Sequence, residues 1–400
     1  MNKKLLLIRG HRLNKWEMQN YEPLQKYYDI KAVASYDHRY PLEEIKLPII
    51  KLHSLREIIG RVPKVRGLFN IVFKNWFLKD YLLGLDPLLA WADIVHSLET
   101  QAHYIFSYQT ALSKPKYGYR LVITHWENIP FAYEDITMAN RHIKPRVQKE
   151  TDHFLAITEM AKAALLLEGV PEERISVVNY GVDLQRFCPK PKNKERMDKL
   201  GLSPEDVVLL FIGRFVWEKG VFEILFAMKT LLDQMQTIDR NRIKCLLIGS
   251  GEEKNRIREV IARLNLNHTV KILPDFPYHD IPEIHNVADI FLLPSAPTKH
   301  LREQYGMVLV EAMAMGKPVI STTSGSIPEV VGVGGLLIPP ADHVSLFHAM
   351  KTLIESADLR MEIGKRARLR AEQKFDATQA AQKIHQIYQK VLLDHQRNRL

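Results

Sequence analysis

Short apolar runs alternate with segments of helical period along the whole chain, and the alternation is carried out twice. Many of these runs are apolar at every position, as expected for parallel strands that are covered by helices on both faces. This pattern predicts two doubly wound, Rossmann-like α/β domains. The expected strands are 4–8, 30–34, 49–53, 94–98, 121–125, 154–158 and 175–179 in the first half, and 207–213, 244–249, 270–273, 290–294, 318–321 and 336–339 in the second.

The stretch from residue 187 to residue 205 separates the two sets of strands. It holds two prolines, a run of charges and few apolar residues, which is typical of a linker. A chain of 400 residues also exceeds what one core usually serves. We therefore expect a first domain over 1–187 and a second over 188–376. Ligands of open parallel sheets bind outside the carboxyl ends of the strands, so we expect the two domains to face a common cleft.

Cysteine content and hydropathy exclude some classes of protein. Two cysteines, Cys188 and Cys245, supply neither a disulfide framework nor a metal cluster. No apolar run approaches the roughly 18–20 residues that a membrane-spanning helix needs. No nucleic-acid-binding motif is present. We expect a cytoplasmic protein that does not bind nucleic acid.

The segment EQYGMVLVEAMAMGKPVIST, residues 303–322, carries two carboxylates, Glu303 and Glu311. The apolar run after Gly306 predicts a buried helix that begins near this glycine. The first amides of a helix lack carbonyl partners and attract phosphate. Carboxylates on either side of such a start suit the hydroxyls of a nucleotide-sugar. The alternative is an ordinary helix with acidic residues near its ends.

A second segment, GRFVWEKG, places two cations just after an expected strand. The strand ends at Gly213, and Arg214 and Lys219 follow in the loop that leads to a helix. A forked guanidinium and a compact ammonium together suit a diphosphate. The alternative is a pair of solvated surface cations.

One histidine in the first half, His125, stands at the end of an expected strand, where its imidazole would reach a sugar hydroxyl or a developing charge. A structural histidine is the alternative. The chain contains no Asp-x-Asp triplet, which is the common carboxylate clamp for a metal-bound diphosphate. We therefore expect no metal and no other cofactor, with the diphosphate charge met by Arg214, Lys219 and the helix start.

Several motifs occur together in the order known from one enzyme family. GRFVWEKG, GSGEE, ADIFLLPS, EQYGMVLVEAMAMGKPVIST, SGSIPEVV and GGLLIPPAD resemble family 4 of the retaining glycosyltransferases, also described as glycosyl transferases group 1, which have the GT-B fold. The resemblance is specific from about residue 152 to residue 342 and weak over the first 120 residues. It implies a final helix, within 377–400, that returns to the first domain.

The resemblance also implies a role for each matching residue. Arg214 and Lys219 would neutralise the donor diphosphate, Glu303 would contact the donor sugar, and Glu311 would accept from the ribose hydroxyls. The family's Gly-rich loop after the first strand is reduced here to Gly10. The residues expected to act on the donor are Arg214, Lys219, Glu303 and His125, and those expected to bind it are Gly213, Gly306, Met307, Val308, Leu309 and Glu311.

The activity implied is metal-independent, retaining transfer of a hexose-type sugar from a nucleotide-diphosphate-sugar to an acceptor hydroxyl. A carbohydrate or lipid-linked acceptor would fit polysaccharide, glycolipid or other glycoconjugate synthesis. Two alternatives stay open: a nucleotide-sugar epimerase of the same architecture, and a catalytically silent nucleotide-sugar-binding protein.

A basic and aromatic segment, residues 46–80, lies within the first domain. It carries eight basic and two acidic side chains interleaved with Phe69, Phe73, Trp76 and Phe77. This composition is typical of an interfacial helix on anionic lipid. We expect peripheral contact with the inner face of the membrane, and a solvated surface helix is the alternative.

Overall fold

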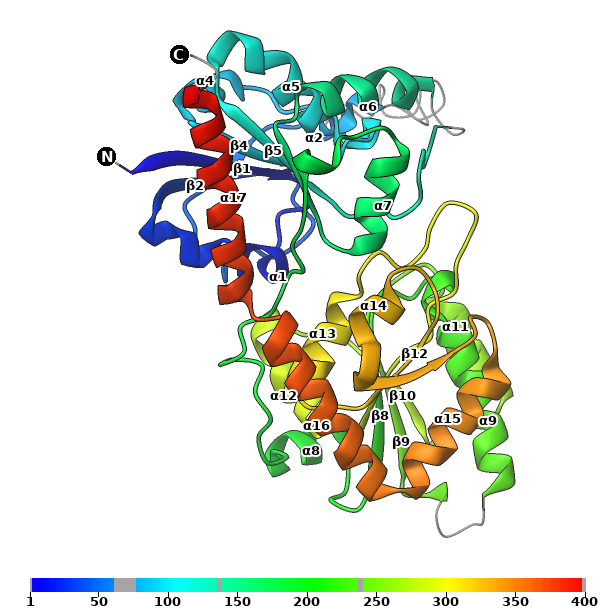
Figure 1. Ribbon diagram of the computed structural model, residues 1–400. Coiled ribbons are helices and arrows are strands. Elements are labelled where there is room, and N and C mark those ends of the chain that lie inside the picture. The colour runs from blue at the N-terminus through cyan, green and yellow to red at the C-terminus, as the bar shows by residue number, and fades with distance from the viewer. Residues whose placement is uncertain (1, 61–76, 135–137, 236–239, 398–400) are drawn as a thin grey trace. The chain divides into compact units, whose positions relative to one another are not determined.

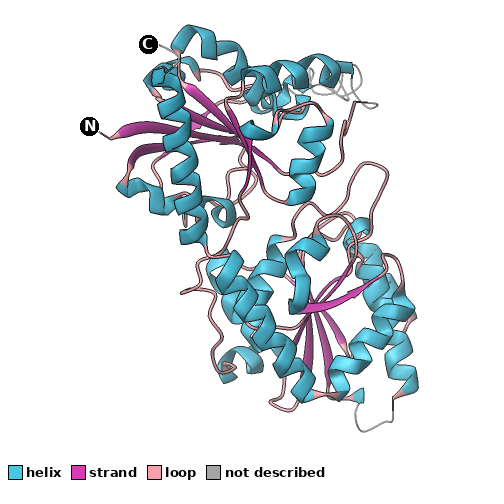
Figure 2. Cartoon of the chain, in the orientation of Figure 1, coloured by secondary structure: helices cyan, strands magenta, loops and turns pink. Residues whose placement is uncertain are grey.

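The structure, a computed structural model, describes residues 2–60, 77–134, 138–235 and 240–397. Unit 1 consists of Met1–Tyr180 together with Ala377–Leu400, and unit 2 consists of Gly181–Asp376. Each unit is a parallel β-sheet with helices packed on it (Figures 1 and 2). The expected pair of doubly wound α/β domains is therefore confirmed.

The sheet of unit 1 has the strand order β3-β2-β1-β4-β5-β6-β7, in which every pairing is parallel. Strand β1, an interior strand, is fully buried from Leu5 to Ile8 because helices cover both faces. The strand order reverses between β1 and β4, which creates a topological switch point. The strands are β1 (Lys3–Gly10), β2 (Tyr28–Ser35), β3 (Ile49–Leu52), β4 (Ile94–Leu98), β5 (Arg120–His125), β6 (His153–Ala156) and β7 (Ile175–Val177).

Helices pack on this sheet and join its strands. The α-helices of unit 1 are α1 (Lys15–Met18), α2 (Leu55–Gly60), α4 (Asp86–Trp91), α5 (Ile105–Tyr117), α6 (Met138–Glu150), α7 (Glu159–Leu167) and α17 (Ala377–Arg397). Short 3₁₀ helices are η1 (Glu22–Lys26), η2 (Phe77–Asp80), η3 (Ala102–Tyr104) and η4 (Glu172–Arg174).

The sheet of unit 2 repeats this topology with the order β10-β9-β8-β11-β12-β13. Its switch point lies between β8 and β11, whose neighbouring residues pair in parallel. The strands are β8 (Val207–Ile212), β9 (Ile243–Ile248), β10 (Val270–Leu273), β11 (Ile290–Leu293), β12 (Val319–Thr322) and β13 (Gly335–Ile338). The helices are α8 (Lys194–Leu200), η5 (Trp217–Lys219), α9 (Val221–Gln234), α11 (Lys254–Arg263), η6 (Tyr278–Asp280), α12 (Ile281–Val287), α13 (Met307–Ala314), α14 (Ile327–Val331), η7 (Gly332–Gly334), α15 (His343–Glu355) and α16 (Ala357–Lys374).

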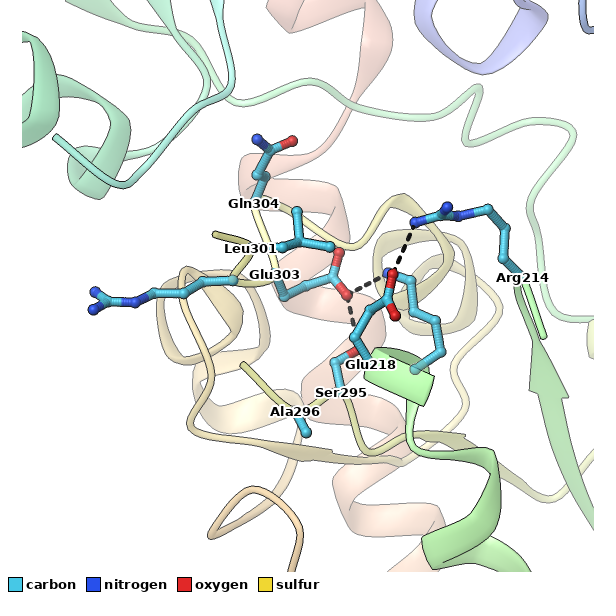
Figure 3. Close-up of a pocket in the computed structure, with 9 residues that line it drawn as sticks. Arg214, Glu218, Ser295, Ala296, Leu301, Glu303 and Gln304 are labelled. Carbon is cyan, nitrogen blue, oxygen red and sulfur yellow. Dashed lines mark hydrogen bonds and ion pairs between the residues drawn. The ribbon is translucent and has the colours of Figure 1, made fainter. Parts of the chain in front are cut away.

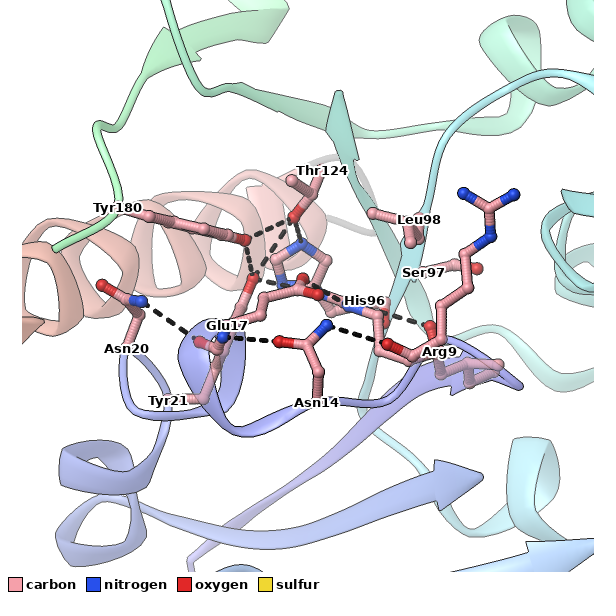
Figure 4. A network of polar contacts seen from close by, with 12 residues as sticks. Arg9, Asn14, Glu17, Asn20, Tyr21, His96, Ser97, Leu98, Thr124 and Tyr180 are labelled. Carbon is pink, nitrogen blue, oxygen red and sulfur yellow. Dashed lines mark hydrogen bonds and ion pairs between the residues drawn. The ribbon is translucent and has the colours of Figure 1, made fainter. Parts of the chain in front are cut away.

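A buried arginine organises the polar interior of unit 1 (Figure 4). Arg9 on β1 is 0% exposed, and its Nε lies 2.6 Å from Oε1 of Glu17. Its remaining N–H groups donate to the Tyr21 hydroxyl and to the carbonyl of His96, each at 3.0 Å. Because every buried charge here has a partner, the desolvation cost of the pair is offset by contacts that the fold holds in place.

The same network holds the two ends of unit 1 to its sheet. Tyr180, the last residue before unit 2, contacts Oγ1 of Thr124 at 2.8 Å. His96 on β4 contacts Thr124 through Nε2 at 2.8 Å and the hydroxyl of Tyr388 through Nδ1 at 2.5 Å. Since Tyr388 belongs to α17, this contact fixes the C-terminal helix on the first sheet, where the resemblance predicted it.

Residues 187–205, expected to form the linker, belong to unit 2 and contain α8. Asn193 accepts from the Arg196 amide and caps this helix, while Met197 and Leu200 are buried. Composition alone did not predict this helix, because its few buried apolar residues lie among charged ones. The chain passes from one unit to the other between residues 180 and 181.

Most of the basic aromatic segment, residues 61–76, lies outside the described residues. In its described flanks, Arg56 is paired with Asp80 at 2.6 Å. Over the described ranges, the helices are all too short or too polar to cross a membrane.

Candidate functional site

The carboxyl ends of β8 and β11 meet at the switch point of unit 2, and two loops leave the sheet there. The first leads from β8 through η5 to α9 and carries Arg214 and Lys219. The second leads from β11 to α13 and carries Glu303. Doubly wound sheets bind ligands at this position because the two loops leave in opposite directions and open a crevice.

The two loops are joined through their backbones. The amide of Ala296 donates to the carbonyl of Glu218 at 2.9 Å. Gly220 has a φ of +72°, and a Cβ on it would lie 2.0 Å from the carbonyl oxygen of Pro294. Only glycine permits both the left-handed backbone and this approach. Lys219, the preceding residue, is thereby held against the second loop.

Lys219 and Glu303 form the central contact between these loops. The ammonium nitrogen lies 2.6 Å from Oε2 of Glu303, and Ser295 donates to the same oxygen at 2.8 Å. Burial favours the neutral acid, but the Lys219 charge and the hydrogen bonds outweigh it and lower the pKa of Glu303. Glu303 is therefore a carboxylate near neutral pH and accepts hydrogen bonds.

The turn that contains Gly325 and Ser326 packs against the backbone of Glu303. Gly325 has a φ of +55°, and a Cβ there would lie 2.2 Å from the carbonyl oxygen of Glu303. The amide of Ser326 donates to this same oxygen at 2.9 Å. The backbone of Glu303 is thus fixed by close packing as well as by its side-chain contacts.

A cavity of about 120 Å³ opens beside this contact. Arg214 reaches it from the first loop with a side chain that is 48% exposed, and its guanidinium lies 3.6 Å from Glu218. Figure 3 shows Arg214 and Glu303 approaching from opposite loops. Cations on one side and a hydrogen-bond acceptor on the other suit a ligand that carries both negative charge and hydroxyl groups. The cavity is lined by Arg214, Glu218, Lys219, Ser295, Ala296, Leu301, Arg302, Glu303 and Gln304.

Helix α13 begins at Gly306, which has a φ of +79°. Met307 and Val308 follow, in the first turn, where helix amides have no carbonyls of their own helix to bind. The Leu309 amide, by contrast, donates to the Gly306 carbonyl at 2.8 Å. The helix start therefore lies where the sequence predicted it, and Leu309 offers less to a ligand than its two predecessors.

Glu311 lies one turn further along α13 and is buried. It accepts from the Tyr278 hydroxyl at 3.1 Å, and its other oxygen lies 3.7 Å from Nε2 of His285. Glu311 does not line the cavity beside Glu303. Gly213 also lies outside that lining, where its carbonyl oxygen packs against Gly249.

His125 belongs to unit 1 and ends strand β5. It is 1% exposed, and its Nδ1 lies 3.0 Å from Oε2 of Glu99. The contact with Glu99 was missed from the sequence, because nothing in the residues around position 99 identifies a functional carboxylate. Ser295 was missed for the same reason. The described residues contain no group of three or more His, Cys, Asp or Glu side chains placed to hold a metal ion.

Residues 192–370 match the family model of glycosyl transferases group 1. The D-inositol 3-phosphate glycosyltransferase of Streptomyces bingchenggensis (strain BCW-1) is 30% identical over 261 residues, which cover 62% of this chain and 55% of that protein. The putative colanic acid biosynthesis glycosyltransferase WcaL of Escherichia coli (strain K12) is 31% identical over 243 residues, covering 59% and 56%. The chain thus spans little more than half the length of these two curated relatives. Over residues 192–370 the chain is thus similar to glycosyl transferases group 1.

The crystal structure of Anabaena Alr3699/HepE in complex with UDP-glucose is similar over 97% of this chain and 99% of that one, with a TM-score of 0.75 and 20% identity. A likeness at this identity concerns the fold. Together with the two parallel-sheet units, it shows the GT-B fold.

Replacing Gly325 by alanine tests whether close packing fixes Glu303. We expect Gly325→Ala to destabilise unit 2 by more than the roughly 1–2 kcal/mol that a left-handed backbone costs an alanine, because the Glu303 carbonyl must also move. Calorimetric unfolding measures this loss. The matched control is Gly169→Ala, where φ is +86° and nothing lies within 4 Å of the new Cβ. Equal losses in the two variants would contradict the packing argument.

Proposed function

We propose that this protein transfers a sugar from a nucleotide-diphosphate-sugar to an acceptor hydroxyl with retention of configuration and without a metal ion. The observation that carries the proposal is the cavity at the switch point of unit 2, where Arg214, Lys219 and Glu303 converge. The match of residues 192–370 to glycosyl transferases group 1 supports it independently.

Three charged side chains of the cavity lining, and several residues outside that lining, have proposed roles. Arg214 and Lys219 stabilise the charge that grows on the departing diphosphate, which is a transition-state interaction and therefore raises the rate. Glu303 accepts hydrogen bonds from hydroxyls of the donor sugar, in keeping with its lowered pKa. Glu311 would take the ribose hydroxyls, and the amides of Met307 and Val308 would hold phosphate oxygens. Unit 1 contributes His125, whose proposed partner is the donor sugar.

The proposed chemistry is a front-face substitution. The acceptor oxygen forms a bond to the anomeric carbon on the side from which the diphosphate leaves, while the bond from that carbon to the phosphate oxygen breaks. The acceptor proton passes to the released phosphate oxygen. No protein nucleophile is needed in this scheme.

Lys219→Ala is expected to lower turnover on the order of a hundredfold or more, the size seen when one preorganised electrostatic donor is removed. The rate of nucleoside diphosphate release from a panel of nucleotide-sugars, with UDP-glucose as the first probe, measures this. Lys229→Ala is the matched control, since Lys229 lies on the following helix and pairs with Asp233 at the surface. A correctly folded Lys219→Ala protein with normal turnover would show that Lys219 takes no part in the reaction.

Retention and metal independence are tested together in the product. We expect the anomeric configuration of the donor sugar to reappear in the product, as read from its proton NMR coupling constant, and we expect EDTA to leave the rate unchanged. An inverted product, or a rate lost to EDTA and restored by a divalent cation, would overturn these parts of the proposal. A reaction without acceptor serves as control, because an epimerised sugar still joined to the nucleotide would identify an epimerase instead.

We further propose a cytoplasmic protein that meets an anionic membrane through residues 46–80, which would suit a lipid-linked acceptor. The net charge of +6 over these residues supports this. Flotation should show binding to vesicles containing phosphatidylglycerol at low salt and release at high salt, since surface charge is screened.

The charge-reversed pair Lys64→Glu and Arg66→Glu should then lose vesicle binding. The control Lys365→Glu with Arg366→Glu changes net charge equally on the exposed surface of unit 2. Equal binding by both double variants would contradict a role for the segment.

A further inference from the structure

A carboxylate and an imidazole lie side by side at the carboxyl ends of β4 and β5, next to the switch point of unit 1. Strands β4 and β5 lie next to one another (Figure 1). Leu98 pairs with Thr124 across them, so the next residues along, Glu99 and His125, are neighbours at the carboxyl edge of the sheet. The Glu99 amide continues the ladder by donating to the Thr124 carbonyl at 2.9 Å. Doubly wound sheets present ligand-binding groups at this edge.

Glu99 is held in a strained and fully specified position. Its φ is +60°, a left-handed conformation that side-chain-bearing residues rarely adopt. Its Oε1 accepts from the amides of Trp126 and Glu127 at 2.7 and 3.1 Å, which leaves Oε2 3.0 Å from Nδ1 of His125. Strain of this kind persists where the surroundings determine it, and it is concentrated at functional sites.

His125 offers its second nitrogen to a ligand. The ring is 1% exposed, and within the part of the chain that the structure describes neither ring nitrogen has a partner in hydrogen-bond geometry. Nδ1 does lie at ion-pair distance from Glu99, at 3.0 Å, whereas the structure gives Nε2 no ion-pair contact among the described residues. A buried polar atom without a partner is rare in native proteins and calls for an explanation. Because Nδ1 faces Glu99, Nε2 lies on the opposite side of the ring.

We propose that Glu99 is a positioning residue that holds His125 with a proton on Nδ1 and its Nε2 available to the substrate. The identity of that substrate rests on the proposed function. The arrangement of Glu99 and His125 is independent of it. A carboxylate that binds one nitrogen of a histidine fixes the tautomer and the orientation of the ring. With both nitrogens protonated, Nε2–H donates to a sugar hydroxyl or to developing negative charge.

The charges around the ring favour the imidazolium. Burial opposes it, but Glu99, followed by Glu168 at the end of α7 and Glu127 after β5, outweighs burial and raises the pKa of His125. Glu168 is itself paired with Lys144 of α6 at 2.6 Å, which weakens its effect. The pKa of Glu99 is lowered in turn, since His125 and the backbone amides outweigh its burial. The imidazolium is then lost as the pH rises through the raised pKa of His125.

Glu99→Gln tests the pair directly in the full-length protein. The carboxamide keeps an oxygen for the two amides but removes the charge, so burial then dominates and the pKa of His125 falls. In ¹⁵N-histidine NMR, with the signal assigned by His125→Gln, we expect Nδ1 to be protonated in the wild type and the titration midpoint to move to lower pH in the variant. An unchanged midpoint and tautomer would overturn the proposal.

The pH profile of turnover tests the consequence for catalysis. We expect the wild-type rate to decline as the pH rises through the His125 midpoint. Glu99→Gln should shift this decline to lower pH and lower the rate on the order of tenfold, as when a partner that orients a functional histidine is lost. Glu99→Asp should restore part of the wild-type profile. A folded Glu99→Gln protein with the wild-type profile would overturn the positioning role.

Glu127→Gln is the matched control for both measurements. Glu127 is as buried as Glu99 and also accepts from two backbone amides, each at 3.0 Å, but its charge raises the pKa of His125 less than Glu99 does. We expect this variant to keep the Nδ1 proton and nearly the wild-type midpoint. An equal shift in both variants would contradict a specific role for Glu99. Wild-type protein without any turnover would contradict the proposed function, and NMR would still decide the arrangement of the pair.

Discussion

The ion pair between Lys219 and Glu303 is the constraint on which the arrangement of the candidate donor site depends. It joins the loop after β8 to the loop before α13, and each partner is held by a glycine whose Cβ would collide with backbone: Gly220 for Lys219 and Gly325 for Glu303. A buried charge pair contributes little net stability. It does fix the positions of a cation and an acceptor, and this is what a charged sugar-phosphate ligand requires.

The same topology produces both polar sites. Each unit reverses its strand order once, and each reversal separates two loops at the carboxyl edge of the sheet. In unit 2 these loops carry Lys219 and Glu303, and in unit 1 the strand beside the reversal carries Glu99. Neighbouring strands set the distance between these groups, because the parallel register places consecutive strand ends next to one another. The chemistry is thus carried by short loops, while the buried strands supply the geometry.

The sequence predicted the fold, and it singled out three charged residues that the structure brings together at one cavity. Buried parallel strands are continuous apolar runs, so all of the expected strands appear within a few residues of their predicted bounds. Arg214, Lys219 and Glu303 follow such strands and were identifiable by charge. Glu99 and Ser295 were not, since their roles come from strand register and loop packing. The helix at 194–200 was missed because its few buried residues, such as Met197, lie among charges.

The two sites differ in how they use buried charge. At Glu303 a cation supplied by the protein lowers the pKa of the acid, so a fixed ammonium and a fixed carboxylate are present before any ligand arrives. In the proposed function a diphosphate would meet charges that need no reorientation, which is the condition for strong electrostatic stabilisation. In unit 1 the negative charge of Glu99 raises the pKa of His125, and the charge of this histidine depends on pH. The first arrangement is constant near neutral pH, whereas the second makes His125 the group through which protonation would control the reaction.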